Sequence, residues 1–449
     1  MILKNLLSFF ASIIICIILV LTITDAREFN WQLYNFGAFY LIFFFGTFGI
    51  TAISLLWSFF KKNKIDKKLI GKVIFRSSLL LNIFLLGMGI YFYDGLTPKE
   101  YSGNRYVYNY VQPENYNDGI LTGNISESSL SPDTLKSIME KIVNDPDYHG
   151  MNSFLLWNKG RLITEEYFYD FTKDTRQDIR SATKSITSLL FGIALDKGFI
   201  KSPDEKISQY FPEYFKNYDK SSEKFEITIR DLLNMHSCLD CNDWDRNSPG
   251  QEDKLYKTDD WIKSLLDVGT IEKDSVYARY CTGGVNVIGE IISRTSGMKL
   301  DTFADKYLFK PLGISNYNFS YTPKGRTEAG GHIYFTSRDL LKLGILVANN
   351  GTWNDQQIIS SDWINKIYMD NVKMPDPRLK YPGYGFLWWK INFGFKTKGI
   401  QALGNGGQLI LVFPELETVI VFTGSNFNNY RMLSPFKIVE ESILPNFMK

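Results

Sequence analysis

The chain has 449 residues, 45% hydrophobic and 22% charged, so it can bury a large core and hold more than one folded unit. Its formal net charge of +2 argues against a nucleic-acid partner, which usually requires a concentrated basic patch. The three histidines, His149, His236 and His332, are too scattered for a metal-ligand spacing, so we expect no metal site.

Three apolar stretches fill the first ninety-odd residues: Leu6 to Ile23, Phe36 to Phe60 and Val73 to Tyr93. Each is about long enough to cross a hydrocarbon core of roughly 30 Å. Buried soluble helices are the alternative, but none of the three shows an amphipathic stripe. We therefore predict that residues 1–95 form an all-α anchor of three transmembrane spans in the plasma membrane, in contact with the lipid bilayer.

The loop between the second and third spans predicts the orientation of this anchor. Lys61 to Lys72 carries six lysines against Asp66, and short lysine-rich loops stay in the cytoplasm. The third span then runs outward, which places everything after Asp94 on the extracytoplasmic side. A cleaved signal peptide in place of the first span would leave this placement unchanged, and "TITDAR" offers no A-x-A cleavage site.

The rest of the chain divides into a polar segment and a long globular part. Residues 96–133 are rich in Asn, Tyr, Ser and Gly and lack periodicity, which predicts an extracytoplasmic tether. In the globular part, residues 134–449, we expect a helix near Thr134 to Asn144. A strand pair that turns at Lys159-Gly160 should follow.

Helical patterns dominate from Ser185 to about Asp370, and strands return near the end in "YGFLWWKINF", "QLILVF" and "TVIVFTG". A final helix is expected near Pro435 to Leu444. Strands at both ends of the globular part around a helical middle predict an α+β fold, with one antiparallel sheet formed by both chain ends and a helical insertion.

Three of the four cysteines, Cys238, Cys241 and Cys281, lie in the part predicted to be exported, where disulfides persist. "NMHSCLDCND" lacks the strand-to-helix setting of a thioredoxin-like C-x-x-C, and a zinc site would need two more ligands nearby. The residues therefore favour one structural disulfide, with its pairing left open.

The strongest chemical signal is the pair Ser181 and Lys184 in "RSATKSITSLLFGIALDKG". Residues three apart share a helix face. Serine needs a neighbouring proton acceptor to become a nucleophile, and burial at a helix N-terminus disfavours the charged form of lysine. A serine cap with a solvated lysine is the plain alternative. S-x-x-K also occurs at four other serines, Ser58, Ser221, Ser296 and Ser434, but only Ser181 opens a long amphipathic helix.

This helix resembles the nucleophile helix of the serine β-lactamase and penicillin-binding-protein superfamily, most of all its class C-like branch with esterases and nylon-oligomer hydrolases. Further matching segments follow in family order from roughly Ser153 to the C-terminus. They read "LLNMHSCLDCNDWD", "YARYCTGGVNVIGEIISRTSG", "AGGHIYFTSRDLLKLGILVANNG", "YGFLWW" and "GNGGQLILVFPELETVIVFTGSN".

The resemblance implies a role for the tyrosine of the second family motif, Y-x-N, which reads Tyr280-Cys281-Thr282 here. Tyr280 would share the serine proton, with a pKa lowered by the lysine cation, whereas Thr282 replaces the asparagine that recognises an amide. The resemblance also implies that Cys241 pairs with Cys281, since both flank motifs that meet near the family's site.

The third family motif falls on Gly404-Asn405-Gly406, followed by Gly407, and its usual cationic first residue is absent. The backbone amides of Ser181 and Gly407 would form the oxyanion hole. His332 is expected to be a packed histidine. Asp243, Trp244 and Asp245 fall where family members have substrate-contacting loop residues, and at least one of Trp388 and Trp389 should lie in the core.

Together these features predict a membrane-anchored serine hydrolase of the esterase or amidase type. Ser181 would be the nucleophile, and Lys184 and Tyr280 would transfer its proton. The substrate would be a small-molecule or peptide ester or amide, and no cofactor would be needed. A D,D-carboxypeptidase or β-lactamase-like activity on cell-wall peptides is the alternative, and a sensor that is acylated without turnover is another.

Overall fold

The computed structural model describes residues 105–272, 278–369, 372–374, 383–391 and 397–448. The three predicted membrane spans lie outside these residues. Among the helices that are described, none has the length and hydropathy needed to cross a membrane.

The domain is built on an eight-stranded antiparallel sheet in the order β2-β1-β12-β11-β10-β9-β8-β7, so strands from both ends of the domain pair side by side. The strands are β1 (Met151–Asn158), β2 (Arg161–Tyr167), β7 (Val372–Lys373), β8 (Gly383–Gly385), β9 (Trp388–Ile391), β10 (Gly399–Gly404), β11 (Gln408–Phe413) and β12 (Thr418–Gly424). The pair of β1 with β12, second and third in this order, joins segments that lie more than 250 residues apart, as Leu156 opposite Ile420 shows.

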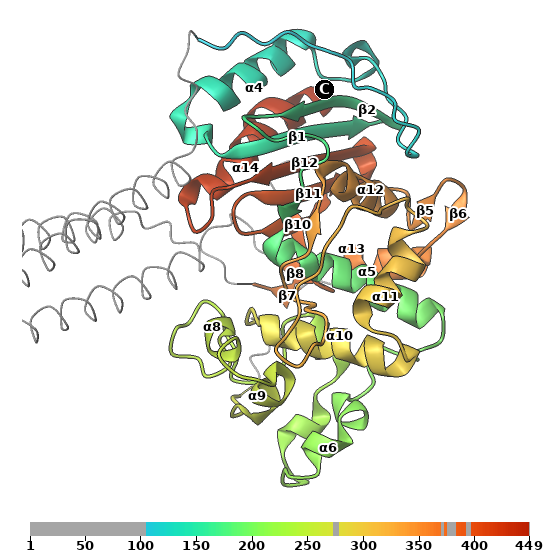
Figure 1. The fold of residues 1–449 in the computed structure, drawn as a ribbon, viewed down its shortest axis with the longest axis vertical. Helices are drawn as coiled ribbons and strands as arrows, with labels where there is room; N and C mark the ends of the chain where they lie inside the picture. Colours follow the sequence, from blue (N-terminus) through green and yellow to red (C-terminus); the bar gives the residue numbers. More distant parts are fainter. Residues whose placement is uncertain (1–104, 273–277, 370–371, 375–382, 392–396, 449) are drawn as a thin grey trace, which may run out of the picture. The chain divides into compact units, whose positions relative to one another are not determined.

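Helices and short strands fill the insertion between β2 and β7, and helices α6, α8, α9 and α10 lie together beyond the sheet (Figure 1). The helices are α4 (Pro132–Asn144), α5 (Thr183–Asp196), α6 (Pro212–Phe215), α7 (Ile229–Leu233), α8 (Glu252–Leu255), α9 (Trp261–Asp267), α10 (Thr282–Ser296), α11 (Leu300–Ala304), α12 (Ser337–Ala348), α13 (Ser361–Met369), α14 (Ser434–Ile438) and α15 (Leu444–Phe447). Two short strands in the insertion, β3 (Gln177–Asp178) and β4 (Tyr334–Phe335), pair with each other. Strands β5 (Thr352–Trp353) and β6 (Gln356–Gln357) form a separate hairpin.

This arrangement confirms the predicted α+β fold with its antiparallel sheet and helical insertion. The hairpin turns at Lys159-Gly160 as predicted, with both residues at positive φ (48° and 85°). The segment "YGFLWWKINF", predicted as one strand, is instead divided into β8 and β9. Phe386 and Leu387 between them adopt φ of 48° and 66°, left-handed backbone that no strand accommodates.

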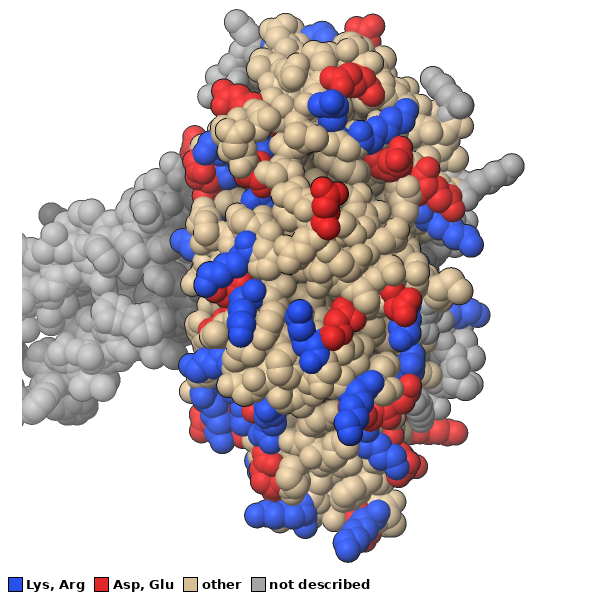
Figure 2. All heavy atoms as spheres, turned by 90° about the vertical axis from the view of Figure 1, so that its right-hand side faces the viewer, with Lys and Arg blue, Asp and Glu red and all other residues tan. Residues whose placement is uncertain are grey.

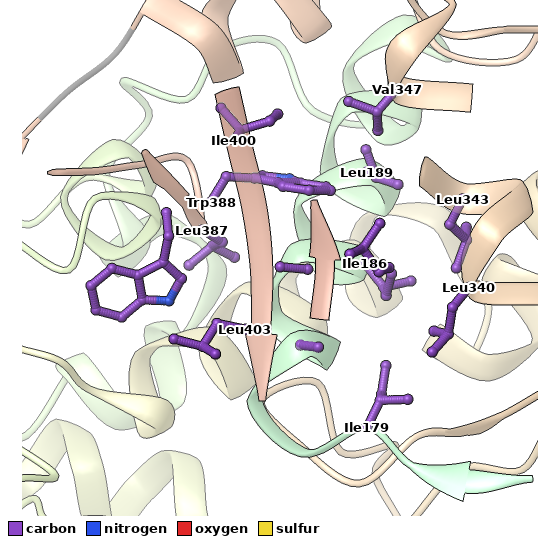
Figure 3. Packing of buried hydrophobic residues seen from close by; sticks show 14 of the residues in the cluster. Ile179, Ile186, Leu189, Leu340, Leu343, Val347, Leu387, Trp388, Ile400 and Leu403 are labelled. Atoms are coloured by element: carbon purple, nitrogen blue, oxygen red, sulfur yellow. The ribbon is translucent and has the colours of Figure 1, made fainter. Parts of the chain in front are cut away.

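Helix α5 lies in the interior of the domain, against β9 and β10 on one side and α10 on another. In Figure 3 its side chains Ile186 and Leu189 point toward Leu340 and Leu343 of α12, and Trp388 of β9 lies beside them. All of these side chains are essentially inaccessible to solvent. Burial on this scale fixes the helix axis, and with it the position of the residues at its N-terminus.

The segment predicted as a tether, residues 96–133, is described from residue 105, and this part packs onto the domain. Tyr108, Ile120, Ile125 and Leu130 are each at most 4% exposed. The backbone also binds the edge of β2, where the amide of Leu162 donates to the carbonyl of Leu121 at 2.8 Å. The polar composition of this segment did not predict the packing, because tyrosine can bury a large apolar ring while its hydroxyl binds a polar partner.

Charged side chains of both signs are interspersed over the face shown in Figure 2. This is the surface expected from the nearly balanced composition, in which 50 Lys and Arg stand against 48 Asp and Glu.

Candidate active site

Ser181 and Lys184 meet at the start of α5. Ser181 lies in the short 3-10 turn Arg180–Ala182 that leads into the helix, and it is partly exposed. Lys184 is in the first turn of the helix and only 1% exposed. Its Nζ donates to Ser181 Oγ at 3.1 Å and to the carbonyl oxygen of Gly330 at 2.7 Å. The buried amine therefore has its hydroxyl partner on one side and a backbone acceptor on another.

The carbonyl that accepts from Lys184 is held by the loop 328–332. Ala329 is fixed from both sides, because its amide donates to Asn286 Oδ1 at 2.8 Å and its carbonyl accepts from Thr187 Oγ1 at 2.7 Å. Gly330 follows, and a Cβ there would come within 2.6 Å of the Thr282 methyl group and 3.0 Å of its carbonyl oxygen. Glycine is thus required for the loop to come close enough to α10 for this contact.

Tyr280 is the third member of the cluster, placed just before α10. Its phenol is a hydrogen-bond partner of Ser181, and Lys184 Nζ lies 4.9 Å from the centre of its ring. Trp244 stacks on the ring with centroids 5.1 Å apart and an interplanar angle of 7°, and Trp389 stacks at 5.9 Å. The structure therefore brings the three residues predicted to be catalytic into contact, and two tryptophan rings stack on the phenol.

The predicted lowering of the Tyr280 pKa is wrong. Burial of the phenol raises its pKa above the ordinary value of 10.0, and the opposing effects of the Lys184 charge and the Ser181 hydrogen bond do not cancel this. The nearby carboxylates Asp243 and Glu252 raise the pKa further. Tyr280 is therefore a neutral phenol at physiological pH, able both to accept and to donate a hydrogen bond.

Two acidic groups adjoin this cluster on the α8 and α10 side. Burial, with the Glu252 charge, raises the pKa of Asp243 to about 7. Its Oδ2 accepts from the amide of Thr282 at 2.7 Å, and its Oδ1 accepts from the amide of Glu252 at 3.0 Å. The Thr282 hydroxyl donates to Glu252 Oε2 at 3.0 Å and is only 1% exposed. Thr282, the residue that departs from the Y-x-N motif, therefore binds the first residue of α8.

The glycine-rich turn of the third motif lies at the end of β10, next to the backbone that precedes Ser181. A Cβ on Gly404 would come within 2.1 Å of the carbonyl oxygen of Ile179, so this backbone leaves no room for a side chain, cationic or otherwise. Gly406 and Gly407 follow at φ of 96° and 94°, conformations that favour glycine. Trp388 and Trp389, on the adjoining strand β9, are both buried.

A second charged cluster flanks Ser181 on the side of β3. His332 Nδ1 and Asp178 Oδ2 are 2.8 Å apart, and Asp178 Oδ1 accepts from the amide of Arg180 at 2.9 Å. Arg180 and His332 both have positive φ, 50° and 57°, which is uncommon for side chains of this size. His332 was predicted to be a packed histidine, and the structure gives it this ionic partner beside the turn that carries Ser181.

Burial alone would lower the pKa of His332, but the hydrogen bond with Asp178 and the charges of Glu328 and Asp178 raise it above 6.5. Glu328 is itself buried, which raises its pKa, and Tyr256 donates a hydrogen bond to it at 3.2 Å. Asp178, Glu328 and Glu252 were not predicted as site residues, because acidic residues that far apart form no spacing pattern. The available signal for this cluster was the match of "AGGHIYF" to a family segment, because that segment contains His332, the partner of Asp178.

The disulfide implied by the resemblance is confirmed: Cys241 and Cys281 are bonded, with Cα atoms 5.5 Å apart. Cys238 is buried and lies outside this disulfide. In the part of the chain that the structure describes, no group of three or more His, Cys, Asp or Glu side chains is placed to hold a metal ion.

Comparison with known proteins matches residues 135–431 to the family model described as Beta-lactamase. The 6-aminohexanoate-dimer hydrolase of Paenarthrobacter ureafaciens is 22% identical over 289 residues, 60% of this chain and 71% of that one. Among solved structures, a class C beta lactamase from Rhodobacter sphaeroides aligns with a TM-score of 0.53 and 14% identity, over 71% of this chain and all of the other. A family VIII carboxylesterase aligns with a TM-score of 0.54 and 15% identity, over 68% and 97%.

The ionic pair of His332 and Asp178 makes stability depend on pH. A raised histidine pKa contributes stability that is full below the unfolded value of 6.5 and is lost as pH rises through the folded value. We expect the free energy of unfolding to fall more for the wild type than for His332→Gln between about pH 6 and about pH 9. Urea denaturation across this range measures it, and equal falls in both proteins would contradict the assignment.

Proposed function

Because the chain belongs to the beta-lactamase family, we propose that it is a serine hydrolase that cleaves an ester or amide bond through an acyl-enzyme on Ser181. One observation carries this proposal. The buried Lys184 Nζ lies 3.1 Å from Ser181 Oγ, within the reach required of a base that removes the hydroxyl proton.

In the proposed reaction, Ser181 Oγ attacks the substrate carbonyl while its proton passes to Lys184. Tyr280, as a neutral phenol bonded to Ser181, relays a proton to the leaving group. Water then attacks the acyl-enzyme with the same groups acting in reverse. The relationship to a 6-aminohexanoate-dimer hydrolase and the fold shared with a carboxylesterase support the ester or amide class.

We further propose that backbone amides bind the oxyanion. The amide of Ser181 is one donor, and Gly407, in the turn after β10, is the other that we assign. Supporting this, Gly404 at the end of β10 abuts Ile179, two residues before the nucleophile, so the turn lies close to the reacting segment. Each such donor contributes roughly 3 kcal/mol to transition-state binding.

Replacing the nucleophile tests the proposal directly. Ser181→Ala should abolish labelling of the full-length chain by a fluorophosphonate probe and turnover of a chromogenic short-chain ester, because the acyl-enzyme forms on the Ser181 hydroxyl. Ser221→Ala is the matched control, since Ser221 belongs to another S-x-x-K and lies exposed in a loop.

Three outcomes separate the candidate functions. Turnover by the wild type that disappears in Ser181→Ala supports the hydrolase. Stable labelling of Ser181 without turnover supports the acylated sensor. Labelling that persists in Ser181→Ala and is lost in Ser221→Ala would refute the assignment of the nucleophile.

The alternative activity on cell-wall peptides or β-lactams requires a cation for the substrate carboxylate. The third motif supplies none at Gly404, and the backbone there excludes any side chain. Two arginines, Arg326 and Arg279, could replace that charge. Arg326 is held by Asp260 at 2.7 Å and lies 3.4 Å from Glu290, whereas Arg279 is exposed. A charge-assisted hydrogen bond contributes roughly 1.5–3 kcal/mol, so its loss costs about one to two decades in affinity.

We therefore expect the second-order acylation rate constant for a neutral ester to exceed that for a penicillin. Stopped-flow or burst measurements on the full-length chain give both constants, and a benzyl ester of the same penicillin serves as the control for removal of the carboxylate. A β-lactam rate equal to or above the ester rate would favour the carboxypeptidase or β-lactamase reading instead.

We also propose that residues 1–95 anchor the protein in the plasma membrane, with the hydrolase domain on the extracytoplasmic side. The lysine-rich loop Lys61 to Lys72 supports this orientation. The Cys241–Cys281 disulfide is a second support, since such bonds persist mainly outside the reducing cytoplasm.

This topology predicts the behaviour of reporter fusions. Alkaline phosphatase, which is active only outside the cytoplasm, should be active when fused after Lys449 and inactive when fused near Lys67. Activity of the Lys67 fusion together with inactivity of the Lys449 fusion would reverse the proposed orientation.

A further inference from the structure

The backbone on either side of Tyr280 is bound to a second chain segment, residues 235–243. Before the tyrosine, the amide of Arg279 donates to the carbonyl of Met235 at 2.8 Å. At the tyrosine itself, the carbonyl oxygen accepts from the amide of Asp243 at 2.8 Å. After it, Cys281 is joined to Cys241 by the disulfide. Every residue from 279 to 281 is therefore tied to this one segment.

Asp243 of this segment forms hydrogen bonds with the backbone at three places. Besides its amide, its carboxylate accepts from the amides of Thr282 and Glu252, at the first residues of α10 and α8. These amides have no partner within their own helices. Asp243 thus binds the backbone at Tyr280, at the start of the following helix and at a neighbouring helix.

Trp244, the residue after Asp243, restrains the ring of Tyr280. Trp244 stacks on the phenol ring with an interplanar angle of 7°, and Trp389 of β9 also stacks on it. The ring has little freedom to rotate, and its hydroxyl is held toward Ser181. A displacement of about 1 Å at a catalytic group can reduce a rate by about 100-fold, so restraint of this kind matters for proton relay.

We propose that Asp243 and the Cys241–Cys281 disulfide form a clamp that positions Tyr280 for proton relay, an inference that rests on the proposed function of Ser181. Asp243 is a positioning residue in this account, because it touches the backbone around Tyr280 and not the reacting atoms. The two parts act on the same few residues, so their effects should be coupled and not additive.

The test uses the full-length chain with Asp243→Ala, Asp243→Asn and the paired Cys241→Ser/Cys281→Ser variant, plus all three sites changed together. Active sites are titrated with a fluorophosphonate probe, and kcat and KM for a neutral ester are measured per labelled site. Cys238→Ser is the matched control, because it removes the nearby buried thiol and leaves the clamp intact.

For Asp243→Ala and for the paired serine variant, we expect kcat per labelled site to fall about 10- to 100-fold with KM changed by less than about threefold. Asp243→Asn should recover part of the loss, because its amide oxygen still accepts one of the two N–H groups. The combined variant should lose less than the product of the separate factors. Unchanged kcat per labelled site in Asp243→Ala would overturn the proposal, as would fully multiplicative losses.

Hydrogen exchange measured by mass spectrometry reads the clamp without substrate. We expect faster exchange in the variants at residues 280–284 and 252–255, and unchanged exchange in β1 and β12. Unchanged exchange at 280–284 would show that no clamp exists. A wild type that is not labelled by the probe would refute the proposed function, while the exchange data would still decide whether the segments are held together.

Discussion

The buried amine of Lys184 is the constraint on which the rest of the site depends. Removing an amine from water costs free energy unless polar partners replace the lost hydration. Here the partners are Ser181 Oγ, the carbonyl of Gly330 and the face of Tyr280. They come from three separate segments, so the requirement for polar contacts at one atom explains why α5, the loop 328–332 and the start of α10 must converge.

The parts of this structure that the sequence predicted are those with a local signature. The helix behind Ser181 follows from apolar residues at helical spacing, and the hairpin at Lys159-Gly160 follows from alternating strands around a glycine. Strands β11 and β12 begin and end where the apolar runs do. The order of the strand and helix patterns along the chain predicted a sheet formed by both chain ends. The role proposed for Tyr280 required the family resemblance, because no spacing pattern among neighbouring residues points to this tyrosine.

What the sequence could not predict depends on contacts between distant residues. The pKa of Tyr280 is raised because the phenol is fully enclosed, and burial outweighs the lysine charge that the motif alone suggests. His332 pairs with Asp178 across more than 150 positions. Residues such as Leu387 and Arg180 take left-handed backbone for reasons of tertiary packing, with no glycine or asparagine to signal it.

The segment that packs along β2 also determines where a truncated chain can start and keep all contacts of the domain. Arg338 of α12 is 5% exposed, and its guanidinium is paired with Asp118 at 3.0 Å and also with Glu165. A truncated chain that starts where the family match starts, at residue 135, would lack Asp118 and would uncover the side of β2. Arg338 would keep Glu165 as its carboxylate partner and lose the two hydrogen bonds that its guanidinium donates to Asp118. The part of the chain that packs as one unit therefore extends further toward the N-terminus than the family match does.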